Sequence, residues 1–153
     1  MKENESDWEL DPEFEKRDAL RKAGIPVEIA RTDQLLIRET IDSDISELYR
    51  IGTDQAVRKY IAPMQPTLEE EIVYTKAYVR HMYAFYDFGL WTVLEKDAYG
   101  QERVIGRAGL FPSERLAGQI EMGYMIAPEC QGNGYGKEAA ETVLRYAFNV
   151  QSP

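Results

Sequence analysis

Hydrophobic and polar positions in the second half of the chain predict three consecutive strands. The strands span residues 89–96, 103–111 and 119–126. The last has the clearest period, because Ile120, Met122, Tyr124 and Ile126 fall on one face when every second residue is counted. Short loops join the three segments, so we expect an antiparallel meander.

Helical spacing and capping residues predict helices on both sides of this meander. The first begins with a possible cap at Asp11 and ends at Gly24, and the longest opens with the capping box at residues 67–70 and runs to about residue 86. Shorter helices are predicted at residues 42–52 and 139–149, and a short strand at residues 34–38. The core order is strand, two helices, three strands and helix, which indicates a mixed α/β fold of the α+β type.

Two of these helices carry apolar stripes that we expect to face the core. On the longest helix the stripe consists of Tyr74, Tyr78, Met82 and Phe85. On the last helix it consists of Ala140, Val143, Leu144 and Ala147.

Composition narrows the classes of protein to which the chain can belong. Its 153 residues suit one domain, and it has no apolar run long enough to cross a bilayer. The net charge of −9 argues against a nucleic-acid partner, whose phosphates require a concentrated positive surface. His81 and Cys130 are the single histidine and the single cysteine, so no metal site of the His/Cys kind is expected. One cysteine and a polar, acidic start favour the cytoplasm.

Candidate chemistry is concentrated after the last predicted strand, in residues 126–137. Gly132, Gly134 and Gly136 allow the backbone to curl tightly and approach a ligand, and a helix begins just after them. Free N–H groups at a helix start attract phosphate oxygens, and Lys137 can add a positive charge. These residues predict a cradle for a diphosphate. A Walker A loop would need glycine in place of Gln131, and a dinucleotide fingerprint would need glycine in place of Lys137.

The hexad Gln131-x-x-Gly134-x-Gly136 resembles motif A of the GNAT acetyltransferase superfamily, Q/R-x-x-G-x-G/A, which binds the pyrophosphate of CoA. Residues 121–124 before it and 139–148 after it are similar to the branch that includes ribosomal-protein-alanine N-acetyltransferases. The resemblance covers roughly residues 34–150. It implies an acyl-CoA-binding domain at residues 31–153 that is incomplete at its C-terminus, and it leaves residues 1–30, with their predicted short helix, as an N-terminal extension.

The resemblance also implies where acetyl-CoA, the cosubstrate, would bind. In the family, the fourth strand has a bulge and splays from the fifth, and the pantetheine arm pairs with the backbone exposed there, a role that maps to residues 125–127. The implied cofactor-binding residues are Met125, Ile126, Ala127, Gln131, Gly132, Asn133, Gly134, Tyr135, Gly136 and Lys137. No metal is implied.

The implied reaction is direct attack of a neutral amine on the thioester of acetyl-CoA. Glu121 lies on the opposite strand face from Tyr124, and a carboxylate there could accept the proton of the incoming ammonium, which makes it the catalytic candidate. A solvent-facing strand glutamate is the structural alternative. We interpret Cys130 as a non-catalytic small residue, because a thiol nucleophile requires an activating base.

A full domain of this family continues with a fifth strand, a fourth helix and a hairpin, and that portion carries the usual general-acid tyrosine. We therefore expect the chain to lack the C-terminal strands, to leave residues 119–126 with an incompletely paired edge, and to self-associate through it. The partners expected are an acyl-CoA and an amine, with no nucleic acid and no membrane. Two alternatives stay open, a non-catalytic acyl-CoA-binding or regulatory module and an interaction domain whose glycine turn is structural.

Overall fold

The structure is a computed structural model that describes residues 12–151, with side chains described for residues 12–149. The possible cap at Asp11 lies outside the described residues. Five strands form one sheet: β1 (Glu28–Arg31), β2 (Leu35–Arg38), β3 (Leu90–Lys96), β4 (Glu102–Pro112) and β5 (Ile120–Ile126). The sheet has the order β1-β2-β3-β4-β5, and every neighbouring pair is antiparallel, so the predicted meander and fold class are confirmed.

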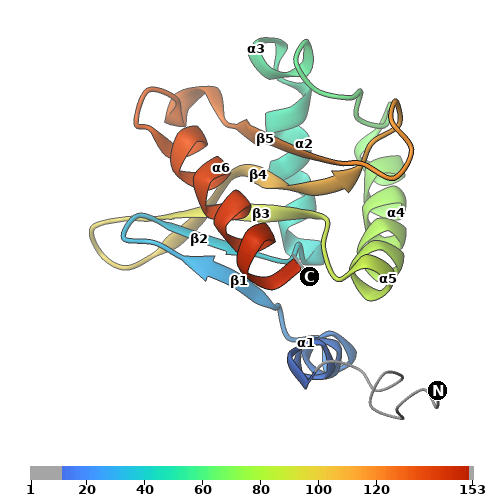
Figure 1. Ribbon diagram of the computed structural model, residues 1–153. Helices are drawn as coiled ribbons and strands as arrows, with labels where there is room; N and C mark the ends of the chain where they lie inside the picture. Colours follow the sequence, from blue (N-terminus) through green and yellow to red (C-terminus); the bar gives the residue numbers. More distant parts are fainter. Residues whose placement is uncertain (1–11, 152–153) are drawn as a thin grey trace, which may run out of the picture.

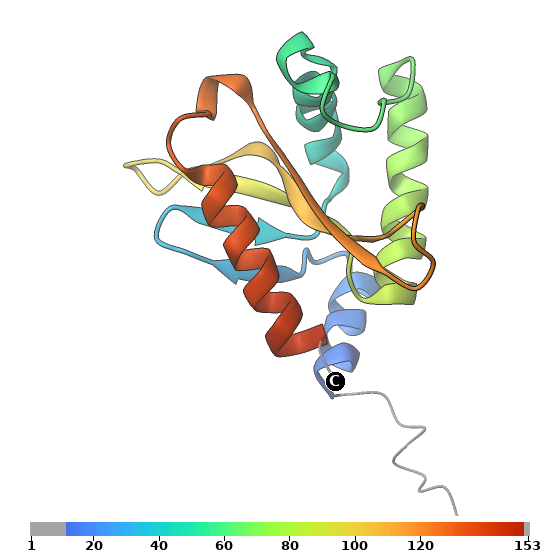
Figure 2. The same ribbon diagram turned by 45° about the horizontal axis from the view of Figure 1, so that its top comes forward.

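The helices lie on both faces of this sheet (Figure 1). They are α1 (Pro12–Lys22), α2 (Ile45–Thr53), α3 (Gln55–Arg58), α4 (Leu68–Tyr78), α5 (Ala84–Tyr86) and α6 (Tyr135–Tyr146), with 3₁₀ turns at Asp42–Asp44 and Pro128–Cys130 and π-helical turns at Val79–Tyr83 and Ala147–Gln151. Figure 2 shows α6 crossing one face while α2 and α4 cover the other. No helix in the part of the chain that the structure describes is long and apolar enough to cross a membrane.

The core lies between these layers and is built from the strand residues that face the helices. Trp91, Val93 and Ile105 are fully buried, and Val143 of α6 packs into the same cluster. The rings of Trp91 and Tyr146 of α6 pack edge to face with a centroid distance of 5.3 Å. This packing fixes α6 across the sheet, which positions the loop that precedes it.

Strand β1 was not predicted, since the first strand was expected at residues 34–38. Its four residues include two exposed charged ones, Glu28 and Arg31, so it lacks the apolar alternation of a buried strand. It forms a hairpin with β2 and extends the sheet by one strand. The boundary proposed between residues 30 and 31 falls within this strand, and the two-part division of the chain stays a prediction.

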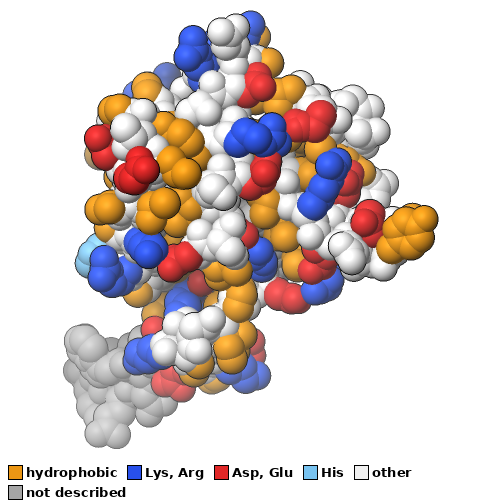
Figure 3. Space-filling view, turned by 180° about the vertical axis from the view of Figure 1, so that it is seen from behind, with side chains coloured by type: hydrophobic (Ala, Val, Ile, Leu, Met, Phe, Trp, Pro, Cys, Tyr) orange, Lys and Arg blue, Asp and Glu red, His pale blue; other side chains and the backbone are white. Residues whose placement is uncertain are grey.

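The expected core-facing stripe on the long helix is wrong in part. Tyr74 is 54% exposed and Phe85 is 80% exposed, whereas the buried side of the helix carries Glu71, Thr75 and Tyr83. The Glu71 carboxylate is buried because it accepts hydrogen bonds from the Thr75 hydroxyl and from a loop amide. The hydrophobic side chains gather on the surface beside the single histidine (Figure 3).

The buried face of the last helix is also rotated about the helix axis relative to the predicted apolar stripe. Ala139, Thr142 and Val143 are its buried residues, and Leu144 is 41% exposed. The helix begins at Tyr135, within the glycine segment where its start was expected, although the apolar repeat alone indicated residue 139. Thr142 can be buried at little cost because its hydroxyl donates a hydrogen bond to the Glu138 carbonyl at 2.7 Å.

Helix α1 has no buried residue and is held instead by an ionic cluster. Arg21 donates to both Glu39 and Asp87, and Arg17 also binds Asp87. The side chains of Arg21 and Glu39 are 13% and 5% exposed, so the cluster is largely shielded from water. Burial raises the pKa of Glu39, and Arg21 opposes that shift.

We expect Arg21→Ala to destabilise the chain by about 3–5 kcal/mol, because it leaves the buried Glu39 without its cation. Urea unfolding followed by circular dichroism measures this change. The matched control is Lys22→Ala on the exposed side of α1, which should change the free energy of unfolding little. Equal effects of the two substitutions would contradict the role of the cluster.

Candidate functional site

The backbone of β5 presents alternate residues to its two edges. Ala127 donates its N–H to the Ile105 carbonyl at 2.7 Å, so the odd-numbered residues, including Met125, bond toward β4. The backbone groups of Tyr124 and Ile126 consequently point away from β4, to an edge where no described strand pairs. The predicted open edge is therefore present in the described residues, while self-association through it stays a prediction.

The bulge implied for this strand is not found in its pairing with β4. The register runs from Gly106 opposite Ile126 to Pro112 opposite Ile120 without a shift. The sheet has its central irregularity between Val93 and Leu94 of β3 instead. Among residues 125–127, Ile126 is thus the one whose backbone faces the open edge.

The glycine-rich segment forms a loop between β5 and α6. After the 3₁₀ turn, Gly132 and Gly134 have φ angles of +88° and +77°, and Gly134 is the residue that caps α6. A Cβ atom built on either glycine would meet nothing within 4 Å, so the space above the loop is open. As at every helix start, the first N–H groups of α6 have no acceptor within the helix.

Two side chains of the loop stabilise it through hydrogen bonds to backbone carbonyls. The Gln131 amide donates to the Ile126 carbonyl at 3.0 Å, and the Asn133 amide donates to the Cys130 carbonyl at 3.1 Å. The outward carbonyl of Ile126 is therefore hydrogen-bonded by Gln131, whereas the N–H of Ile126 stays available at the open edge. Both predicted residues support the loop in this structure.

The first turn of α6 is tied to the sheet. The Glu138 carboxylate accepts from the Thr32 hydroxyl at 2.5 Å, and a hydrogen bond to Glu95 raises the pKa of Tyr135. Gly136 lies so close to the Tyr124 ring that a Cβ would approach a ring carbon to 2.7 Å. Lys137 is 83% exposed, and its ammonium lies 3.9 Å from Glu141.

Glu121 lies on the opposite face of β5 from α6. Tyr124 packs toward α6, so the odd-numbered side chains face the α2 and α4 layer. Glu121 is half-buried opposite Phe111 of β4, and its carboxylate has no hydrogen-bond partner among the described residues. Five residues separate it from Ile126, a distance of about 17 Å along a strand.

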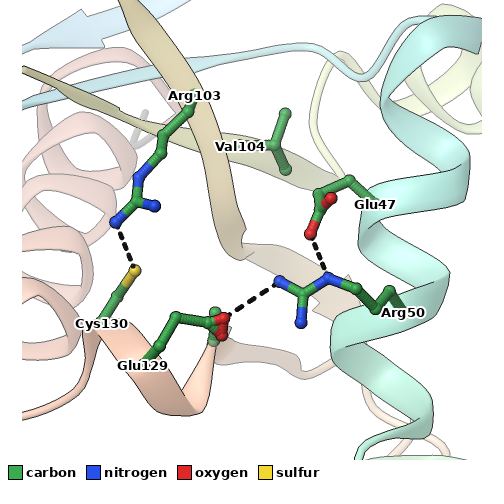
Figure 4. Close-up of a pocket in the computed structure, with 7 residues that line it drawn as sticks. Glu47, Arg50, Arg103, Val104, Glu129 and Cys130 are labelled. Atoms are coloured by element: carbon green, nitrogen blue, oxygen red, sulfur yellow. Dashed lines mark hydrogen bonds and ion pairs between the residues drawn. The ribbon is translucent and has the colours of Figure 1, made fainter.

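A pocket of about 270 Å³ lies beneath the loop on the α2 side (Figure 4). Its lining consists of Glu47, Arg50, Arg103, Val104, Ala127, Glu129 and Cys130. Its charges are paired, because Arg50 binds Glu129 at 3.0 Å and Arg103 binds Glu95 at 2.8 Å. The hydrogen bond from Arg50 lowers the pKa of Glu129. Neither arginine could be assigned a role from the sequence, since Glu129 lies 79 residues from Arg50 and Cys130 lies 27 residues from Arg103.

Cys130 is buried at 2% exposure, with its sulfur 3.3 Å from an Arg103 nitrogen. Burial raises the pKa of the thiol, and the positive charge of Arg103 only partly opposes this. Within the described residues no three His, Cys, Asp or Glu side chains are grouped as metal ligands. This environment agrees with a structural role for Cys130.

The comparisons with known proteins place this geometry in a family. The model of the acetyltransferase (GNAT) domain matches residues 34–152. The chain belongs to the GNAT acetyltransferase family. Members of this family transfer an acetyl group from acetyl-CoA to an amine. Its N-terminal helix α1 lies before the part that the GNAT model matches.

Individual relatives agree with the GNAT assignment. The chain is 25% identical over 123 residues to the uncharacterized N-acetyltransferase YoaA of Bacillus subtilis, covering 80% of this chain and 67% of that protein. An acetyltransferase from Agrobacterium tumefaciens has the same fold at 19% identity, with a TM-score of 0.62 and coverage of 81% and 68%. A structure titled as a ribosomal-protein-serine acetyltransferase from Vibrio cholerae matches at 20% identity and TM-score 0.62, covering 79% of this chain and 66% of that one.

We expect the Cys130 thiol of the native chain to react with a disulfide reagent far more slowly than that of the urea-unfolded chain. A burial of this depth requires local opening before reaction. Because the chain has a single cysteine, the absorbance of released thiolate reports this site alone. Equal native and unfolded rates would contradict the buried, unactivated state.

Proposed function

We propose that the chain is an acetyl-CoA-dependent N-acetyltransferase that acetylates an amine by direct attack on the thioester. The observation that carries the proposal is the open glycine loop at the start of α6, placed at the end of a strand with an open edge. A phosphate-binding loop and an unpaired strand edge suit the two ends of one ligand, a diphosphate joined to an amide-containing arm.

In this proposal the CoA diphosphate lies over residues 132–137. Gly132 and Gly134 leave room for it, and the free N–H groups of the first turn of α6 attract its oxygens. The arm runs along the open edge of β5, where the Ile126 N–H is the nearest outward donor. The distance of about 17 Å from Ile126 to Glu121 brings the far end of an extended arm toward the carboxylate.

Glu121 is the proposed general base. The amine forms a bond to the thioester carbonyl carbon, the C–S bond breaks to release the CoA thiolate, and the amine proton passes to Glu121, directly or through one water. Because no described residue occupies the carboxylate by hydrogen bonding, its oxygens are available to accept that proton. The proposed acceptor is a protein N-terminus, as in the ribosomal-protein-alanine branch, or a small-molecule amine.

A non-catalytic acyl-CoA-binding module is the second candidate. No described residue orients the Glu121 carboxylate through a hydrogen bond, as a general base usually requires, and this observation favours the binding module. The two candidates share the loop and differ at Glu121, so they make different predictions for binding and for turnover.

We expect Gly134→Val to weaken CoA binding at least tenfold, because valine strains a backbone at φ +77° and projects into the open space above the loop. Calorimetry with CoA measures the affinity. The matched control is Gly118→Val, which has φ +81°, similarly open surroundings and a place in the β4–β5 loop. If both variants bind CoA as the native chain does, the loop is not the diphosphate site.

We expect Glu121→Gln to lower kcat by about 10²–10⁴-fold while leaving CoA affinity unchanged. Thioester consumption with a panel of peptide and small-molecule amines measures kcat. Glu114→Gln, at an exposed position in the β4–β5 loop, is the control and should retain native turnover. Tight CoA binding with no turnover on any amine, in the native chain as well, would favour the binding module.

A further inference from the structure

Arg107 of β4 differs from the other half-buried arginines of the chain. Arg17, Arg21 and Arg38 each donate two or more hydrogen bonds to carboxylates. The hydrogen-bond partner of Arg107 among the described residues is the Met64 sulfur at 3.8 Å, and none of their carboxylates lies within 4.0 Å of it. A thioether is a weak acceptor, so the guanidinium retains donors that a ligand can use.

The register places Arg107 on the same face of the sheet as the proposed base. Arg107 pairs with Met125, which shares its face of β5 with Glu121. Four residues separate Met125 from Glu121, so the two functional side chains start about 13 Å apart along the strand direction. The positive charge of Arg107 also reaches Tyr78 of α4, whose pKa burial raises and Arg107 partly lowers.

The loop above Arg107 is well anchored. Met64 packs onto Gly52 so closely that a Cβ there would lie 2.8 Å from its sulfur. The next residue is held twice, since the Tyr49 hydroxyl donates to the Gln65 carbonyl at 2.8 Å and the Gln65 N–H donates to Glu71 at 2.9 Å. The guanidinium therefore lies between a fixed loop and the sheet.

We propose that Arg107 binds a carboxylate of the acceptor, so that the enzyme prefers amines that carry an acidic group several bonds from the nitrogen. This inference rests on the proposed function. A guanidinium binds carboxylates in a bidentate manner, and few other ligands match its planar array of donors. The net charge of −9 gives the chain little general attraction for anions, so a half-buried guanidinium without a carboxylate partner among the described residues is a specific place for one to bind.

The separation from Glu121 defines the class of acceptor. An amine near Glu121 and a carboxylate near Arg107 require an extended molecule, because the two side chains are attached roughly 13 Å apart along the strand direction. A peptide N-terminus followed by an acidic residue within the next few positions meets this requirement. A free amino acid, whose two groups are separated by one carbon, is too short.

The test uses the full 153-residue chain, acetyl-CoA and pairs of short peptide amides. Each pair differs in Glu or Gln at the second, third or fourth position after an N-terminal alanine. We expect at least one Glu peptide to have a kcat/KM about tenfold or more above its Gln partner, mainly through KM. Arg107→Met should abolish this preference and Arg107→Lys should keep part of it, whereas Arg58→Gln, an exposed arginine of α3, should leave it unchanged.

The same peptides titrated calorimetrically into the CoA-saturated chain give a readout that does not depend on turnover. Equal affinities and equal kcat/KM values within every Glu and Gln pair, or a preference that survives Arg107→Met, would overturn the role of Arg107. Failure to bind CoA is a failure of the proposed function instead, and the calorimetric titration with CoA alone identifies it.

Discussion

The one-sided pairing of β5 is the constraint on which the candidate site depends. Since its odd-numbered residues bond to β4, the backbone of Tyr124 and Ile126 is directed to the open edge. The same alternation turns the Tyr124 ring toward α6 and Glu121 toward the opposite layer. The seven residues of this strand thus provide an open backbone edge, a ring that packs against the first turn of α6, and a carboxylate on the far face. In the proposed function these features serve the extended arm of the ligand, the diphosphate loop and proton transfer, respectively.

The loop keeps its shape because both of its ends are fastened. At its start, Arg50 forms an ion pair with Glu129, and Arg103 forms an ion pair with Glu95 and a hydrogen bond with the Cys130 sulfur. Beyond it, the hydrogen bond of Glu138 to Thr32 ties the first turn of α6 to the β1–β2 turn. A diphosphate site needs N–H groups that already point to one place, and these contacts supply that order in the described chain.

The sequence predicted features whose causes are local. The glycines at residues 132–136, the alternation in residues 119–126 and the capping box at Thr67 each act within a few residues, and the strand, loop and helix formed where they indicated. The ionic anchor of α1 was not predictable in this way, because Arg21 reaches partners 18 and 66 residues away. The outward turn of Tyr74 has a more local cause, since Glu71 fills the buried side of that helix through hydrogen bonds with Thr75 and the Gln65 amide, and the apolar repeat does not indicate that a glutamate is buried.

The left-handed backbone at Gly132 and Gly134 has a consequence for chirality. At φ angles of +88° and +77° the chain adopts the mirror image of the conformation that L-residues favour. An L-alanine at either position would be strained, although its methyl group would enter open space, whereas a D-alanine would adopt this backbone conformation without that strain. The handedness of the amino acid at this loop thus tests the conformational requirement for glycine directly.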